Sequence, residues 1–281
     1  MAHARIKAYT RDGLKFDVID EGPIDGDVIV LLHGFPQMNT SWNKVAPLLH
    51  AQGYRTLAPN QRGYSPGARP KGRRPYVTTE LVKDVETLID LTGGPVHVVG
   101  HDWGAMVAWG LAMLNADKVR TLTAVSVPHP AAFMKAMPKG QLLESWYMAM
   151  FNLPRLPEWL MTNPKAAHYF LDKFGMKPDA RAAYERDFGD GAALKGGLGW
   201  YRALPFSDRK LFGMRVSVPT TYVWSDRDPA LGRVGAELCE RYVTAPYRFI
   251  ELNGVSHWIP DEEPDELAAA ILDRVGAEVR S

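Results

Sequence analysis

The chain has 281 residues, enough to bury a large core in one α/β domain or in two smaller ones. Its 33 Lys and Arg residues balance 32 Asp and Glu residues, and the net charge of +1 does not favour nucleic acid or an acidic membrane surface as a partner. The longest apolar stretch near the N-terminus, Val28–Leu32, is too short to span a bilayer, and the single Cys239 excludes an intrachain disulfide. These features predict a cytoplasmic protein without membrane insertion that acts on a small, uncharged molecule.

Short apolar runs predict the strands. Residues 5–9 and 14–19 flank Asp12-Gly13, a dipeptide typical of tight hairpin turns, so the chain is expected to open with two antiparallel strands. Later runs have the continuous apolar character of strands that are buried on both faces of a parallel sheet. These runs are residues 28–32, 55–58, 96–99, 121–127, 220–224 and 247–252.

Helical patterns alternate with these strands, one from Thr78 to just before Gly93 and another from residue 264 to 275. Between about residues 128 and 215 the alternation stops, and the chain becomes rich in Met, Trp, Tyr, Pro and Lys. This change predicts an inserted helical lid, which would shape a substrate pocket and exclude water, although a purely structural layer of helices would also suit the pattern. We therefore expect a core of residues 1–128 and 216–281 with a lid of residues 129–215.

The most informative motif is a sharp turn between a strand and a helix. Gly100 and Gly104 flank Asp102 directly after the run 96–99 and before a helix-like segment. In the G-x-S-x-G nucleophile elbow such glycines let the chain bend and hold a serine above the sheet. A carboxylate at this position attacks carbon without first losing a proton, which suits displacement at an sp³ carbon and an ester intermediate that water hydrolyses. The motif therefore points away from serine esterases.

Hydrolysis of that ester requires a base, and His257 is the candidate. It follows the last predicted strand, in a loop at the carboxyl edge of the sheet where ligands bind in open α/β folds. An acid that orients it is expected in the loop after the run 220–224, where Asp226 and Asp228 are both available. We favour Asp228, because Pro229 helps to fix its turn and Asp226 can be a solvated surface charge. The order nucleophile, acid, histidine matches this hydrolase architecture.

Two backbone amides are predicted to form an oxyanion hole. One belongs to Trp103, the residue after the nucleophile, and the other to Phe35 in the loop after the third strand. Pro36 has no N–H group to donate, so its expected role is to stiffen that loop.

These motifs together resemble the epoxide hydrolases of the α/β-hydrolase fold. The resemblance rests on His33-Gly34-Phe35-Pro36, Gly100-His101-Asp102-Trp103-Gly104, the turn at 224–228 and the segment 254–258, and it covers essentially the whole chain. It implies a mostly parallel, eight-stranded sheet flanked by helices, with an inserted helical lid. It also implies a hydrolase that needs neither a metal nor an organic cofactor.

In that family two lid tyrosines donate hydrogen bonds to the epoxide oxygen. Trp200-Tyr201-Arg202 matches one family segment, and residues 145–151 look like the other, which makes Tyr201 and Tyr147 the counterparts. Ordinary amphipathic lid tyrosines would be bonded to backbone or water instead. The expected substrate contacts are Phe35, Pro36, Trp103, Trp146 and Phe151.

The sequence therefore suggests that Asp102 opens an apolar epoxide, that His257 and Asp228 activate water, and that the product is a vicinal diol. The protein is expected to be a monomer or a homodimer. Haloalkane dehalogenation is a rival, because an indole N–H such as that of Trp103 can hold a departing halide. That reaction would not use paired tyrosines, and Phe35 has no side-chain donor. A ligand-binding protein that kept the scaffold is a rival from another class, although all five proposed side chains are present.

Overall fold

Eight strands form a single sheet in the computed structural model, which describes residues 4–189 and 191–279. The strand order is β1-β2-β4-β3-β5-β6-β7-β8, and all neighbours are parallel except the pairs β1–β2 and β2–β4. The predicted fold class is thereby confirmed. The strands are β1 (Ala8–Arg11), β2 (Leu14–Glu21), β3 (Val28–Leu32), β4 (Arg55–Pro59), β5 (Val96–His101), β6 (Val119–Val125), β7 (Thr220–Ser225) and β8 (Tyr247–Leu252).

The first hairpin turns where the sequence predicted, because Asp12 and Gly13 both have positive φ angles, of 50° and 76°. The start of its first strand was predicted wrongly. β1 begins at Ala8 rather than at residue 5, because the backbone N–H of Ile6 donates to the Asp20 carboxylate at 2.6 Å instead of joining the ladder.

Alternate residues of the central strands enter two separate cores. Leu31 and Val125 pack in one core with residues of α1 and α13, whereas Val30 and Ala124 point to the opposite face and pack with residues of α2 and α3. Burial on both faces is therefore confirmed for these strands. The prediction that both faces are buried is wrong for β8, which is only partly buried because it is an edge strand with one neighbour.

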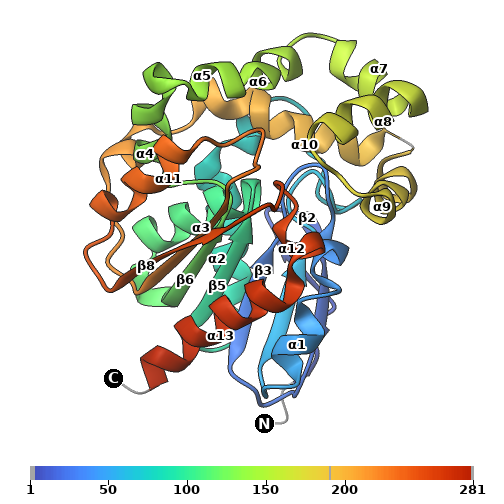
Figure 1. Ribbon diagram of the computed structural model, residues 1–281. Helices are drawn as coiled ribbons and strands as arrows, with labels where there is room; N and C mark the ends of the chain where they lie inside the picture. The colour runs from blue at the N-terminus through green and yellow to red at the C-terminus, as the bar shows by residue number, and fades with distance from the viewer. Residues whose placement is uncertain (1–3, 190, 280–281) are drawn as a thin grey trace.

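Figure 1 shows the helical layers on the two faces of the sheet. α1 and α13 lie in front of it, and α2 and α3 lie behind. The short helices α11 and α12 follow β7 and β8. The helices of these layers are α1 (Ala46–His50), α2 (Thr78–Asp90), α3 (Trp103–Leu114), α11 (Arg233–Leu238), α12 (Ile259–Glu262) and α13 (Pro264–Val279).

Further helices lie between β6 and β7, and most of them cross the upper end of the sheet in Figure 1. The structure assigns no strand to the described residues of this stretch, as expected for the predicted lid, while the boundaries at 128 and 216 stay a prediction. The α-helices between β6 and β7 are α4 (Pro130–Ala136), α5 (Gln141–Glu144), α6 (Trp146–Phe151), α7 (Leu156–Thr162), α8 (Pro164–Lys173), α9 (Pro178–Phe188) and α10 (Ala192–Ala203). The 3₁₀ helices are η1 (Asn39–Trp42), η2 (Arg74–Tyr76), η3 (Ala116–Lys118), η4 (Met137–Lys139), η5 (Leu204–Phe206), η6 (Arg209–Gly213) and η7 (Cys239–Tyr242). No helix in the described residues combines the length and apolar character needed to cross a membrane.

A buried carboxylate ties the first hairpin to α2. Asp84 accepts two hydrogen bonds from Arg62, each of 2.7 Å, and a third of 2.8 Å from Arg11 on β1. All three side chains are largely buried, so the charges are compensated by one another rather than by water.

We expect Asp84→Ala to lower the free energy of unfolding by about 3–5 kcal/mol, because it leaves the buried guanidinium group of Arg62 without its carboxylate partner. Urea unfolding followed by circular dichroism measures the loss. Asp90→Ala is the matched control on the same helix, since its ion pair with Lys118 is exposed and is expected to contribute less than about 1 kcal/mol. Equal losses in the two variants would contradict the expectation.

Candidate active site

Asp102 lies at a strained turn between β5 and α3. Its φ of 54° and ψ of −120° are disfavoured for a residue with a side chain, and they aim the carboxylate away from the end of the sheet. The neighbouring glycines make the turn possible. A Cβ atom on Gly100 would lie 2.3 Å from the Gly104 oxygen, and one on Gly104 would lie 2.0 Å from the Leu32 oxygen. The predicted elbow is therefore present, with close backbone packing as its cause.

Backbone amides hold the Asp102 carboxylate in place. The Phe35 N–H donates to Oδ1 at 2.7 Å, from the loop after β3, and the Trp103 backbone amide is a second donor to the carboxylate. Gly34 lets this loop approach, because a Cβ atom there would lie 2.3 Å from the same Oδ1. The structure thus brings both amides of the predicted oxyanion hole to the Asp102 carboxylate, with the Phe35 amide on Oδ1.

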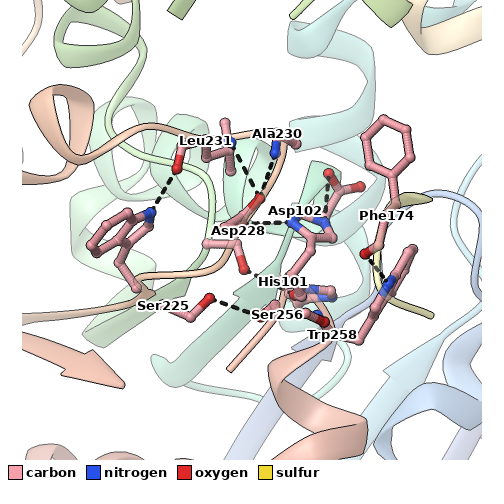
Figure 2. A network of polar contacts seen from close by, with 12 residues as sticks. His101, Asp102, Phe174, Ser225, Asp228, Ala230, Leu231, Ser256 and Trp258 are labelled. Carbon is pink, nitrogen blue, oxygen red and sulfur yellow. Dashed lines mark hydrogen bonds and ion pairs between the residues drawn. The ribbon is translucent and has the colours of Figure 1, made fainter. Parts of the chain in front are cut away.

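His257 and Asp228 form a fixed pair on the other side of Asp102. The imidazole Nδ1–H donates to Asp228 Oδ2 at 2.7 Å, and Nε2 lies 3.5 Å from Asp102 Oδ2. The second Asp228 oxygen accepts from the Ala230 and Leu231 amides at 2.8 and 3.2 Å. Figure 2 shows Asp228 beneath Ala230 and Leu231, with dashed lines from these two residues to one of its oxygens, and Asp102 to its right. Because Asp228 is held on both sides, the imidazole is fixed in one tautomer and orientation.

The alternative acid, Asp226, is exposed and accepts a hydrogen bond from the Gly254 amide. It belongs to the same turn after β7, but it faces solvent rather than the imidazole. The structure brings Asp228, and not Asp226, to His257.

Hydrogen bonds from neighbouring loops hold the backbone around His257. The His257 carbonyl accepts from His101 Nε2 at 2.9 Å and from the Ser126 hydroxyl at 3.3 Å, and the Ser225 hydroxyl donates to the Ser256 carbonyl at 2.8 Å. Burial, together with the neighbouring charge of His257, lowers the pKa of His101 to about 4. His101 is therefore neutral and braces the loop.

Burial and neighbouring charges determine which groups of the site are protonated. Burial by itself would raise the pKa of Asp102, but the hydrogen bond and charge of His257 outweigh it and hold that pKa below its usual range. Burial would lower the pKa of His257, yet the two carboxylates of Asp228 and Asp102 on either side raise it. At neutral pH the site therefore holds an ionised Asp102 beside a charged imidazole.

Two phenols face Asp102 from the inserted helices. Tyr147 comes from α6 and Tyr201 from α10, and their ring centroids lie 6.3 Å apart with planes at 80°. Burial, and then the charge of Asp102, raise the pKa of both phenols, so both keep their protons. The Trp103 side chain is hydrogen bonded to the Tyr201 hydroxyl.

Asp102, Tyr147 and Tyr201 stand where two cavities meet. A small cavity of about 30 Å³ lies on the His257 side, and Phe35, Pro36 and Phe151 line it as predicted. A large, mostly apolar cavity of about 660 Å³ lies on the other side and reaches the surface, with Trp103 in its wall. Further wall residues that the sequence analysis missed are Phe170, Leu171, Phe174 and Trp258 in the small cavity and Met106, Phe133, Met134, Met148 and Phe212 in the large one.

Some of these wall residues had a signal in the sequence. Phe170 and Phe174 are four residues apart, and this spacing places them on one helix face. The Met-rich composition of the lid also pointed to an apolar pocket, although composition does not identify single wall residues.

Trp146 is the one expected substrate contact that the structure does not bring to the site. Its side chain is 56% exposed, lines neither cavity, and packs against the rings of Tyr147 and Phe170 on the outside of the lid. Successive residues of a helix point about 100° apart, so Trp146 turns outward when Tyr147 turns inward.

In the described part of the chain no group of three or more His, Cys, Asp or Glu side chains is placed to hold a metal ion. The acidic and imidazole groups of the site are instead paired with each other and with backbone amides.

Comparison with known proteins places this chain in a family. The sequence profile of the α/β hydrolase family matches residues 29–270, so the chain belongs to the α/β hydrolase family and, within it, to the group that contains the epoxide hydrolases. Epoxide hydrolase A of Mycobacterium tuberculosis is 30% identical over 96% of this chain and 97% of its own length. Epoxide hydrolase 2 of Caenorhabditis elegans is 32% identical over 89% of this chain and 74% of its own length.

Solved structures agree with this assignment. Epoxide hydrolase A from Mycobacterium thermoresistibile superposes with a TM-score of 0.82 and 26% identity, over 96% of this chain and 97% of its own. An epoxide hydrolase from metagenomes of hot environments gives a TM-score of 0.84 with 28% identity, over 98% and 99% of the two chains.

The pairing of His257 with two carboxylates leads to a titration test. We expect Asp102→Asn to lower the pKa of His257 by about one pH unit or more, because one of the two charges that hold its proton is removed. Imidazole nitrogen NMR shifts over a pH series measure this. Asp226→Asn is the control, since Asp226 makes no contact with the ring. A neutral His257 at pH 6 in the unmodified protein, or the same pKa in Asp102→Asn, would contradict this electrostatic picture.

Proposed function

We propose that this protein hydrolyses an apolar epoxide to a vicinal diol through a covalent ester on Asp102. The observation that carries the proposal is the position of the Asp102 carboxylate, between two protonated phenols on one side and the His257–Asp228 pair on the other. The relatives named epoxide hydrolases support the same reaction.

In the first step Asp102 Oδ2 attacks one epoxide carbon, and the carbon–oxygen bond of the three-membered ring breaks. Oδ1 is held by the Phe35 amide, which leaves Oδ2 as the attacking atom. The released oxygen develops alkoxide charge, and it requires hydrogen bonds or a proton as the bond breaks. Tyr147 and Tyr201 both line the two cavities beside Asp102, and they act as the donors to that oxygen. The product of this step is a hydroxyalkyl ester.

Formation of the ester prepares the second step electrostatically. It removes the negative charge of Asp102, and with it two of the interactions that raise the pKa of His257. The proton that the imidazole gives up replaces the one that a phenol transferred to the released oxygen, and the neutral imidazole then acts as a base toward water, while Asp228 keeps its orientation. The same histidine is thus charged before alkylation and basic after it.

Water then attacks the ester carbonyl, and the negative charge of the tetrahedral intermediate develops on Oδ1. The amides of Phe35 and Trp103 already donate to the Asp102 carboxylate in the free protein, so no rearrangement is needed to stabilise the oxyanion. Collapse of the intermediate releases the diol and restores the carboxylate.

The large cavity supports an apolar substrate with one bulky substituent. Its wall is mostly hydrophobic, its volume of about 660 Å³ suits a small organic molecule, and it opens next to Asp102 and both phenols. We infer that the epoxide ring lies between the two cavities and that its larger substituent extends into this one.

Haloalkane dehalogenation is less well supported than epoxide hydrolysis. A departing halide needs N–H donors at the site, and Phe35 offers no side-chain donor beside the Trp103 indole. A halide also leaves without a proton, so two buried phenols beside the nucleophile would have no function in that reaction.

His257→Gln separates the two chemical steps. Glutamine cannot accept a proton, so we expect ester hydrolysis to slow by about 10²–10⁴-fold while alkylation of Asp102 continues. Mass spectrometry of the variant after incubation with styrene oxide should show one added epoxide mass per chain, on the peptide that contains Asp102.

The double variant Asp102→Asn/His257→Gln is the control and should carry no adduct. Diol formation by the unmodified protein without any adduct on His257→Gln would contradict the covalent route. Absence of turnover on styrene-type, aliphatic and fatty-acid epoxides, with unchanged ligand affinity in Asp102→Asn, would favour a binding protein.

The phenols give a separate test. We expect Tyr147→Phe and Tyr201→Phe each to slow alkylation by about 10–100-fold, and the double variant by about 10³-fold or more, because one and then both donors to the leaving oxygen are lost. The rate of adduct formation in the His257→Gln background measures this step alone. Tyr169→Phe, an exposed lid residue, is the control and should leave the rate unchanged. Rates equal to the control would remove the phenols from the mechanism.

A further inference from the structure

A second cleft, of about 770 Å³, lies at the joint between the inserted helices and the core. One wall is the core loop of residues 69–76, which the sequence showed as rich in Gly, Pro and Arg. The opposite wall is formed by the segment around Arg155 before α7 and by one face of α10. We call this feature the basic cleft, because Arg69, Lys71, Arg73, Arg155, Lys195 and Arg202 line it.

The charge of the basic cleft is not compensated by the protein. Glu158 is the one carboxylate among its described lining residues, and Arg202 binds both of its oxygens at 2.7 and 3.1 Å. None of the other five cations makes an ion pair with a carboxylate in the described residues. Five positive charges therefore share one concave surface.

Arg69 supplies a donor that the fold leaves unused. Its Nη2 donates to the Tyr64 carbonyl at 2.8 Å, which fixes the guanidinium group at the wall of the cleft. Its Nε is buried and has no hydrogen-bond partner among the described residues. A buried donor without a partner is costly, and a ligand with acceptor oxygens would satisfy it.

The helix α10 connects the basic cleft with the active site. Lys195, Gly199 and Arg202 lie on its cleft side, while Tyr201 points to Asp102 from another side of the same helix. The helix rests directly on the core, since a Cβ atom on Gly196 would lie 2.0 Å from the Gly63 oxygen. A ligand in the cleft would therefore touch both the helix and the core loop on which it rests.

We propose that the basic cleft binds a small anion that carries at least two phosphate groups. Five uncompensated positive charges are more than a ligand with a single carboxylate would neutralise. Guanidinium groups also match the geometry of phosphate oxygens. The volume suits a small molecule. An extended polyanion such as nucleic acid is disfavoured by the net charge of +1 of the whole chain.

Isothermal titration of the full chain with inorganic triphosphate at physiological ionic strength tests this site. We expect saturable binding of one ion per chain and a higher melting temperature in its presence. Lys71→Glu/Arg73→Glu should weaken binding by about tenfold or more, because two charges of the cleft are reversed. Lys165→Glu/Lys177→Glu makes the same change of net charge at exposed lid positions outside the cleft, and it should leave the affinity unchanged.

Two arms distinguish the sources of the phosphate groups. Binding to phosphatidylcholine vesicles that contain phosphatidylinositol bisphosphate would assign the ligand to a lipid headgroup, and triphosphate binding without vesicle binding would assign it to a soluble molecule. Lack of triphosphate binding, equal weakening by both double variants, or tighter binding of a 20-nucleotide single strand would overturn the proposal. The measurement does not depend on turnover, so its failure leaves the proposed reaction untouched.

Discussion

The buried negative charge of Asp102 is the constraint on which the rest of the site depends. Asp102 is buried, with 8% of the residue's surface exposed, and burial by itself favours the protonated form of its carboxyl group. The Phe35 and Trp103 amides and the charged imidazole of His257 reverse that tendency and keep the group ionised. In the reaction that we propose, the same partners also serve the ester intermediate, so stabilising the ionised carboxylate also organises the later steps.

The sheet brings these partners together. Phe35 follows β3, Asp102 follows β5, Asp228 follows β7 and His257 follows β8, and all four strands point the same way. Residues that are far apart in the chain therefore meet at one edge, as is usual for ligand sites in open α/β sheets. The two central cores keep this edge rigid, because the strands are buried on both faces.

The inserted helices complete the site and limit what reaches it. They supply both phenols and most of the apolar wall, so Asp102 is screened from bulk water and faces two phenol hydroxyls. α10 has a double role, because one side carries Tyr201 and another lines the basic cleft. Its glycines allow that position, since Gly196 and Gly199 sit directly on Gly63 and Tyr76 of the core.

The sequence by itself determined the features that arise from neighbouring residues. Strand runs, the hairpin at Asp12-Gly13 and the elbow at Asp102 follow from local alternation, turn chemistry and glycine placement, which act over a few residues. The choice of Asp228 over Asp226 also had a local reason, in the fixed turn before Pro229, and the structure brings Asp228 to the histidine.

Only the tertiary structure decided which surfaces those elements expose. Several features depend on which distant segments pack together. They are the late start of β1, the half-exposed edge strand β8, the outward side chain of Trp146, the two unequal cavities and the basic cleft. Strand position in a sheet and helix rotation are set by long-range packing, and no pattern of adjacent residues encodes them.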